Sequence, residues 1–475
     1  MFVESKLHAV GSRVVVTCAL LFACSCHPAA ERAALDAASA DVAPADAQHE
    51  DSGITASNFG CIEGLPMGVP ADPVSPLPAV EPRLLWTRQV PGIGLPRRVV
   101  ITDDRVSFVA GNRLFVLDRS GNDVAAFPES PHEPLMGLSA DVSGNLYFAG
   151  AQAYSVSKDG ALRWQIPFGS PLAGDLTAAS MPLLDPTGTL YVSATDGFLY
   201  AIGSQDGSLK WKAQVGLAGA GPTATPAFLA GGAGPVFSAR NASSGLALYR
   251  ASDGKVLGKA AVASGPVSIW KFGYQDLGMV GLQTVENSSR WGRQAIYVLD
   301  QCGRVRWSLP GDRAQSPSLV GFDSRLVVTH RDPDRADGPV SLSMYDSGGA
   351  LVAGPTAAGT GWFWGADNAI YAIACQQQQG SLSGPFRLTA LNDTLAEQWH
   401  LDIEGECPSS GALASDGTMY LTRGPASGVE LLAIRTQSPG LAPVAWPSAV
   451  HDNRGTAWLG SNDSSSFERA GGQNH

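Results

Sequence analysis

The 475-residue sequence predicts an all-β protein in which four-stranded antiparallel units repeat around a β-propeller. One phrase recurs along the chain: residues 188–211 read GTLYVSATDGFLYAIGSQDGSLKW, residues 144–164 read GNLYFAGAQAYSVSKDGALRW, and residues 417–423 restart it as GTMYLTR. Glycine (55) and proline (32) are abundant, as closely spaced turns require. The phrase also returns at about the length of a propeller blade.

The most regular copy of the phrase gives the elements of one unit in order. A short strand with small residues and proline opens the unit, and the apolar strand 190–192 follows. A tight turn at Gly197 leads to the third strand, 199–202, and a turn at Gly207 leads to the fourth, which ends at Trp211. Short alternating strands separated by glycine turns are typical of an antiparallel meander.

A single sheet of this kind has two apolar faces and cannot cover both by itself. Radial stacking covers each face with the neighbouring sheet and leaves only short edges exposed. The residue that ends each unit is expected at Trp86, Phe127, Trp164, Trp211, Leu257, Trp307, Val352, Trp399 and Trp446. These nine positions enclose eight intervals, so we expect eight blades, with seven as the alternative. The strand of Trp86 or residues 456–459 (TAWL) would close the ring.

The N-terminal residues 1–26 are expected to be a lipoprotein-type signal peptide. Basic residues precede an apolar run of signal-peptide length, residues 14–23, which is too short to span a bilayer. The run ends in Leu-Phe-Ala-Cys, which makes Cys24 the expected lipidated residue. Cys26 could be the lipidated residue instead, although the residues before it match the motif less well. An ordinary cleaved signal peptide without lipidation is the other alternative.

Three further segments complete the expected domain organisation. Residues 27–60 are rich in Ala, Asp and Ser, which predicts a disordered tether. Residues 61–462 are expected to form the propeller, and residues 463–475 a disordered tail. No later apolar stretch reaches 18 residues, so a membrane would be reached through the lipid anchor alone.

The charge balance argues against a nucleic-acid-binding surface. The chain has 32 Lys and Arg against 43 Asp and Glu, a net charge of −11. Binding to nucleic acid needs clustered Lys and Arg. A mildly acidic surface instead favours solubility, and a monomer is expected.

The phrase at 188–211 closely resembles the repeats of bacterial quinoprotein-like β-propellers, also called pyrroloquinoline-quinone-like repeats. The ending Val444-Ala445-Trp446-Pro447 is similar to the tail of such proteins. That family contains quinone-dependent dehydrogenases and also non-catalytic scaffolds, such as the lipoprotein subunit of the outer-membrane β-barrel assembly machine. The dehydrogenases hold the quinone over a disulfide between adjacent cysteines and bind calcium or a lanthanide beside it. This sequence has no adjacent cysteine pair, so we expect no cofactor and no enzyme activity.

Other chemistry has little support in the sequence. There is no nucleophile elbow, no phosphate-binding loop and no zinc-type spacing of His and Cys. Asp332, Asp334 and Asp337 loosely match a calcium loop, but their spacing is wrong for an EF-hand, so a solvated acidic loop is expected. Trp362 and Trp364 are expected to pack in the core.

The connections between second and third strands are short in early units and long in three later ones. The long ones are residues 286–293, 331–339 and 376–385. Corresponding loops of successive blades lie on one face, where binding commonly evolves on a rigid scaffold. Neutral drift in loop length is the alternative. The candidate partner-binding residues are Trp291, Arg293, Arg331, Asp334 and Gln377.

Four cysteines lie beyond the signal region: Cys61, Cys302, Cys375 and Cys407. An even number in an exported protein suggests disulfides. Cys375 ends a second strand and Cys407 follows a fourth strand, and both exits face the same side of neighbouring blades. We therefore expect a Cys375–Cys407 disulfide, with Cys302 either bonded to Cys61 or unpaired.

Together these features predict a non-catalytic, exported, lipid-anchored propeller. It would bind a protein or another component of the cell envelope, in the periplasm or at the outer-membrane surface. A quinone-dependent oxidoreductase and a carbohydrate-binding surface protein are the alternatives.

Overall fold

The computed structural model divides the chain into two units, residues 1–50 and 51–475. The residues that it describes all belong to the second unit. They are 73–78, 81–91, 96–102, 104–127, 135–168, 181–185, 187–194, 196–214, 227–231, 234–240, 246–250, 252–260, 267–272, 279–286, 293–299, 305–310, 314–331, 339–375, 384–424 and 428–442.

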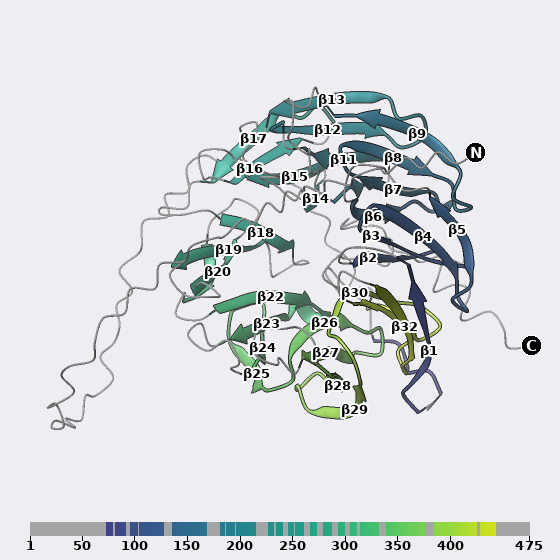
Figure 1. Cartoon of the computed structure of the whole chain (residues 1–475). Coiled ribbons are helices and arrows are strands. Elements are labelled where there is room, and N and C mark those ends of the chain that lie inside the picture. Colours follow the sequence, from purple (N-terminus) through teal and green to yellow (C-terminus); the bar gives the residue numbers. More distant parts are fainter. Residues whose placement is uncertain are drawn as a thin grey trace, which may run out of the picture. The chain divides into compact units, whose positions relative to one another are not determined.

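These residues form eight four-stranded antiparallel sheets (Figure 1). Seven sheets are meanders of four consecutive strands. Their strands are β2 (Pro96–Ile101), β3 (Arg105–Ala110), β4 (Arg113–Asp118) and β5 (Asp123–Phe127); β6 (Met136–Ala140), β7 (Leu146–Ala149), β8 (Gln152–Val156) and β9 (Leu162–Pro167); β10 (Leu183–Leu184), β11 (Thr189–Ser193), β12 (Phe198–Gly203) and β13 (Leu209–Gln214); β14 (Ala227–Gly231), β15 (Gly234–Arg240), β16 (Leu246–Arg250) and β17 (Val256–Ala260); β18 (Val267–Phe272), β19 (Met279–Glu286), β20 (Arg293–Leu299) and β21 (Val305–Leu309); β22 (Ala314–Val320), β23 (Leu326–Arg331), β24 (Ser341–Tyr345) and β25 (Leu351–Thr356); β26 (Thr360–Trp364), β27 (Ile370–Cys375), β28 (Phe386–Leu391) and β29 (Glu397–Ile403). A short 3-10 helix, η1 (Phe322–Ser324), joins β22 to β23.

The eighth sheet, here called the closing sheet, combines both ends of the described chain. It contains β30 (Pro408–Leu413), β31 (Thr418–Arg423), β32 (Val429–Arg435) and, as its fourth strand, β1 (Arg83–Val90). Trp86 of β1 lies opposite Ala433 of β32. The strand of Trp86 therefore closes the set of sheets, as one of the two sequence alternatives predicts, whereas residues 456–459 lie outside the described residues. The predicted all-β class of four-stranded antiparallel sheets is confirmed.

At six junctions the first strands of neighbouring sheets lie beside one another. Contacts join β30 to β2, β2 to β6, β6 to β10, β14 to β18, β18 to β22 and β22 to β26. Side chains link these strands directly. Ser410 Oγ accepts a hydrogen bond from the Val99 N–H (3.0 Å), and Ser139 Oγ donates to the Pro182 carbonyl (2.7 Å). Polar groups of the crowded first strands are thereby satisfied from the neighbouring sheet.

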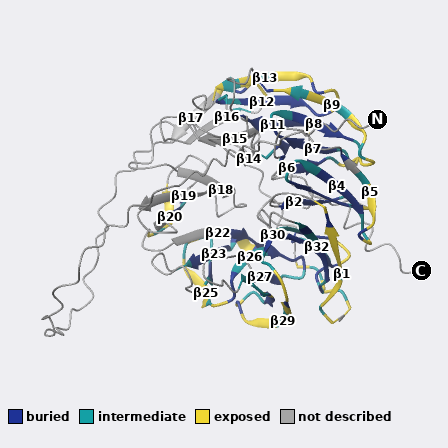
Figure 2. Ribbon diagram, in the orientation of Figure 1, coloured by how far each residue is buried: buried dark blue, intermediate teal, exposed yellow. Residues whose placement is uncertain are grey.

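Burial follows the position of each strand in its sheet (Figure 2). The second and third strands β11 and β12 are almost entirely buried, whereas the fourth strand β13 alternates between exposed and partly buried residues. This pattern follows from stacking, because the inner strands are covered on both faces and the outer strand has an open edge. Among the described residues, no helix has the length and apolar character needed to cross a membrane.

A tryptophan of the fourth strand packs on a glycine turn of the next sheet. Four such pairs are Trp86 with Gly121, Trp164 with Gly207, Trp211 with Gly254 and Trp307 with Gly349. A Cβ added to any of these glycines would come within 2.7–3.0 Å of the indole. All four glycines also have positive φ, so both the turn and the close approach require glycine there. The indoles, of which Trp164 is buried and the other three are partly buried, thus fill the gap between neighbouring sheets.

Three of the expected terminal positions are wrong by one or two residues. In the regular sheets the tryptophan lies next to a β-bulge in the fourth strand. In β13, for example, Trp211 pairs with Ala201 and Leu209 pairs with Ile202, so the residue between them has no partner in the ladder. In three other sheets the position next to this bulge, which corresponds to the tryptophan, is occupied by Ala125, Gly258 and Ala353. The expected residues were Phe127, Leu257 and Val352. The physical reason is that the bulge, which apolar spacing does not reveal, sets the register. Trp446 lies outside the described residues.

The sheet after β25 compensates for the small residue at Ala353. Its turn between third and fourth strands has Leu395 where the other turns have glycine. Leu395 is 1% exposed, has φ +60° and packs in one cluster with Ala353. A large turn residue therefore fills the space that the missing tryptophan leaves, at the cost of a left-handed backbone conformation.

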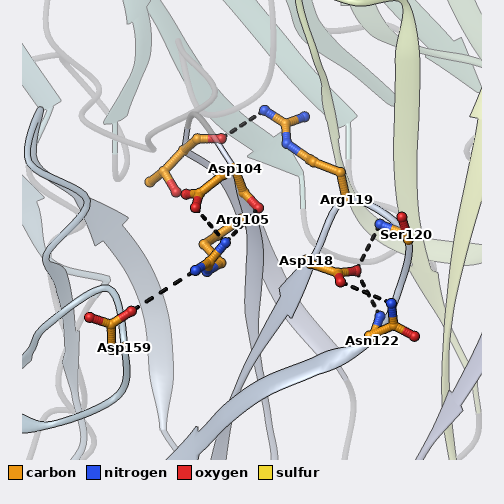
Figure 3. A network of polar contacts seen from close by, with 8 residues as sticks. Asp104, Arg105, Asp118, Arg119, Ser120, Asn122 and Asp159 are labelled. Atoms are coloured by element: carbon orange, nitrogen blue, oxygen red, sulfur yellow. Dashed lines mark hydrogen bonds and ion pairs between the residues drawn. The ribbon is translucent and has the colours of Figure 1, made fainter.

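The links between first and second strands and between third and fourth strands form one side of each sheet, here called the turn face. In sheet β2–β5 these turns carry a polar network (Figure 3). A hydrogen bond from the Asn122 side chain to Asp118 (2.9 Å) lowers the pKa of Asp118. Arg105 pairs with Asp104 and reaches Asp159 in the turn of the next sheet at 4.0 Å. These contacts fix the turns and connect neighbouring sheets.

Two extended segments cross the turn face beside the closing sheet. The N-terminal strap, residues 73–78, binds the β26–β27 turn through the Val74 N–H, which donates to the Ala366 carbonyl (2.7 Å). The C-terminal strap, residues 436–442, binds the same residue of this turn, since the Ala366 N–H donates to the Gly440 carbonyl (2.9 Å). Both ends of the described chain are therefore held at one turn.

Asp367 lies in this turn, and burial raises the pKa of its carboxyl group. A raised folded pKa means that the folded state favours the protonated carboxyl, so the corresponding stability is present below the unfolded pKa and is lost as pH rises through the folded value. We expect Asp367→Asn to be more stable than the wild type near pH 7, with the difference shrinking toward pH 3–4. Urea unfolding of both proteins at several pH values checks this. A difference that grows on acidification would contradict the burial argument.

Candidate functional site: the loop face

The links between second and third strands lie on the side opposite the turn face, here called the loop face. The three long links predicted from the sequence occupy this position in three consecutive sheets, between β19 and β20, β23 and β24, and β27 and β28. The corresponding link between β3 and β4 is only residues 111–112. Since the strand order is the same in each sheet, all three long links emerge on the loop face.

The described residues include two of the five candidate partner-binding positions. Arg293 begins β20 and pairs with Glu286 at the base of the first long link. Arg331 ends β23 opposite Ala314, and its partial burial lowers the pKa of its guanidinium below the usual value. Cys24, Trp291, Asp334 and Gln377 lie outside the described residues, and so do Cys61 and Cys302.

The base of the third long link is joined covalently to the neighbouring sheet. Cys375 ends β27, and Cys407 directly precedes β30 of the closing sheet. The structure pairs these two cysteines as a disulfide, with Cα atoms 5.7 Å apart. This is the pairing that the sequence predicts. Phe386, opposite Cys375 in the ladder, is 1% exposed and anchors the other end of the link.

Arg423 connects the closing sheet to this base. It ends β31, is 8% exposed, and donates from Nε to Glu430 Oε2 (2.7 Å) and from Nη1 to the Glu404 carbonyl. Its guanidinium lies 5.9 Å from the centre of the Phe386 ring. Gly405 leaves room for it, because a Cβ there would lie 2.7 Å from the guanidinium. A mostly buried charge held by a carboxylate, a carbonyl and a ring makes this part of the loop face rigid.

Replacing Arg423 tests how much this network contributes. We expect Arg423→Met to lower the free energy of unfolding by about 2–4 kcal/mol, because it leaves Glu430 without its main partner in a partly buried site. The matched control is Arg387→Met, which removes the exposed pair with Asp402 and should change stability little. Urea unfolding measures both. Equal losses would contradict the special role of Arg423.

The sequence prediction missed Arg423, although the repeat contains a signal for it. The phrase ends GTMYLTR at 417–423, whereas the two other copies end in Ala194 and Gly150 at the same place. A charged residue thus replaces a small one at the end of a second strand. A charged residue at a position where the other copies have a small one indicates a specific local role for Arg423 beyond packing.

The described residues do not fit a quinone cofactor. The described disulfide joins residues 32 positions apart in different sheets, not neighbours that could form a platform. Trp364, the residue best suited to stacking, is 0% exposed and is covered by Gly321 and Phe322. In the described part of the chain, no three His, Cys, Asp or Glu side chains gather as metal ligands.

Comparison with known proteins identifies the type of propeller. The model of the family described as "Outer membrane protein assembly factor BamB", built on pyrroloquinoline-quinone-type repeats, matches residues 83–273. This is less than half of the chain, and the match ends before the first long link. No curated protein matches the chain.

Several solved structures are similar to this one. BamB from Moraxella catarrhalis is 12% identical, with a TM-score of 0.49, over 75% of this chain and 100% of that chain. The C-terminal WD40 domain of Sif2 is 10% identical, with a TM-score of 0.51, over 75% of this chain and 99% of that one. The Dos1 propeller is 13% identical, with a TM-score of 0.52, over 74% and 95%. At these identities the likeness to Sif2 and Dos1 shows the fold alone.

The sheets and their likeness to solved propellers define the class of this protein as a β-propeller of four-stranded antiparallel sheets. Its residues 83–273 form a BamB-like propeller region of the pyrroloquinoline-quinone-repeat type. The resemblance noted in the sequence is confirmed at this level.

Proposed function

We propose that this protein is a non-catalytic, exported scaffold that binds a protein or another component of the cell envelope through the loop face. The observation that carries the proposal is that three consecutive sheets lengthen the same link, after residue 273, where the BamB-type match ends. Long loops on a rigid scaffold commonly bind partners. Arg423 and the Cys375–Cys407 disulfide make the base of the third link rigid, which lowers the entropic cost of binding.

The proposal includes an anchor and a location. The signal-like residues 1–26 and the Ala-, Asp- and Ser-rich residues 27–60 support export and lipidation at Cys24, followed by a tether. The protein would then sit in the cell envelope, in the periplasm or at the outer-membrane surface. Labelling cells with a radioactive or alkyne fatty acid tests the anchor. Label should enter the wild type and be lost in Cys24→Ser; equal labelling would exclude this anchor.

We further propose that the eight sheets are the blades of one closed ring. The pairing of β1 with β32, and the contact of β2 with both β30 and β6, support this arrangement. A ring leaves no sheet face uncovered, which accounts for the repeat in physical terms.

Capture from envelope extracts tests the binding function. The bait proteins are the wild type, Trp291→Ala and Gln377→Ala on the long links, and Val142→Ala as control on the turn face, where Val142 is 83% exposed. We expect a specific protein with the wild type and the control, and at least ten-fold less with Trp291→Ala. Equal recovery with all baits would contradict binding at the loop face.

An activity assay tests the non-catalytic part of the proposal. The purified protein is incubated with pyrroloquinoline quinone and calcium, and the oxidation of alcohols and sugars is followed with an electron-accepting dye. We expect no dye reduction above that of a heat-denatured control. Sustained turnover would overturn the scaffold assignment and favour a dehydrogenase.

A further inference from the structure

The seam between the closing sheet and the sheet β26–β29 is fastened on both faces. On the loop face the Cys375–Cys407 disulfide crosses it. On the turn face the two straps cross it, because residues 436–442 continue from β32 to the β26–β27 turn, where Gly365 pairs with Leu441. The closing sheet contains both ends of the described residues, and residues 404–407 join it to its neighbour by linking β29 to β30 across this seam.

The straps also bind each other across this seam. The Leu77 N–H donates to the Gln437 carbonyl (2.8 Å), and the Leu77 side chain packs on Gly417 of the β30–β31 turn, where a Cβ would lie at 2.8 Å. The Ala442 N–H donates to the Trp364 carbonyl (2.8 Å). Opening of the seam therefore requires loss of the strap contacts on one face and of the disulfide on the other, with residues 404–407 remaining as the chain connection between the two sheets.

We propose that these contacts form a redox-sensitive latch, in which the disulfide limits opening of the closing sheet. Both cysteines are partly exposed, so a small thiol can reach them. A dithiol reductant would transfer two electrons and two protons to the S–S bond, giving two thiols and the oxidised, cyclic disulfide of the reductant. The latch would then depend on the straps alone, and β1, β30–β32 and both straps would open together as one unit.

Hydrogen exchange followed by mass spectrometry tests this on the full chain, before and after reduction with dithiothreitol. We expect at least ten-fold faster amide exchange in peptides covering residues 73–90 and 429–442 after reduction. Peptides covering 136–167, in a distant sheet, should not change. Faster exchange everywhere, or only next to the cysteines, would overturn the latch. A Cys375→Ser/Cys407→Ser variant should reproduce the reduced state without reductant.

A variant of the N-terminal strap distinguishes the contribution of the straps from that of the disulfide. Val74→Pro removes the N–H that binds Ala366, whereas Val74→Ala keeps it and serves as control. With the disulfide intact, Val74→Pro should speed exchange only in the straps and the β26–β27 turn. After reduction, the effect should spread to β1 and β32. If Val74→Pro affects the same residues in both redox states, the disulfide does not limit the opening of the closing sheet.

Discussion

A chain that begins at residue 91 is expected to lose the cooperative fold of a chain that begins at residue 73. The shorter chain lacks the N-terminal strap and β1, which pairs with β32 along its whole length. It also lacks Trp86, which contacts Tyr420 within its sheet and Gly121 in the next. Loss of a fully buried tryptophan costs about 3–5 kcal/mol, and the partly buried Trp86 should contribute somewhat less. Together with the lost strand pairing this approaches the whole stability of a typical domain, about 5–15 kcal/mol.

Circular dichroism, urea unfolding and light scattering together follow this loss. The shorter chain should show a lower urea m-value, a broadened transition and self-association, because the edge of β32 becomes free to pair with another chain. A synthetic peptide of residues 81–91 should restore the transition, and the same peptide with Trp86→Ala should not. If both chains unfold with the same midpoint and m-value, β1 does not close the fold.

Ala353 and Leu395 form a small–large pair where the regular sheets have a large–small pair of Trp and Gly. We expect the two positions to be strongly coupled in a double-mutant cycle. Leu395→Gly removes a buried side chain, a loss of about 2–5 kcal/mol, partly offset by about 1 kcal/mol from relief of the left-handed backbone. Ala353→Trp inserts an indole against Leu395 and should cost about 1–3 kcal/mol through overpacking. The double variant recreates the Trp–Gly pair of the regular sheets, so it should be more stable than either single variant.

The measured quantity is the free energy of unfolding of all four proteins. We expect a coupling energy of at least about 2 kcal/mol in favour of the double variant. The control is the single variant Ala125→Trp opposite Gly160, a small–small pair packed so closely that a Cβ on Gly160 would already meet Ala125 at 2.5 Å. Ala125→Trp has no large turn residue to replace and should stay destabilised. Additive effects of Ala353→Trp and Leu395→Gly would show that the two positions do not share one gap.

The repeated phrase predicts the sheets because it contains the parts that every sheet needs. The strands expected at 190–192 and 199–202 lie within β11 and β12, and Gly197 and Gly207 have the positive φ that tight turns need. Trp164 and Trp211 occupy the expected fourth strands. These features depend on local alternation and turn chemistry, which a sequence displays directly.

Features that depend on contacts between sheets were not predictable in the same way. The register at Ala353 depends on a bulge, and Leu395 compensates for it from another sheet. The straps at 73–78 and 436–442 have no strand periodicity, since their hydrogen bonds go to turns, to each other and to the end of β26. The Cys375–Cys407 pairing was predictable because the repeat places both chain exits on one side of adjacent sheets.

Site-specific photo-crosslinking in the cell envelope tests the central proposal, partner binding at the loop face, most directly. A photoreactive amino acid is placed at position 291 or 377 on the long links, or at position 142 on the turn face. We predict one specific crosslinked protein from positions 291 and 377 and none from position 142. Crosslinks from position 142 alone, or the same products from all three positions, would contradict a binding surface on the loop face.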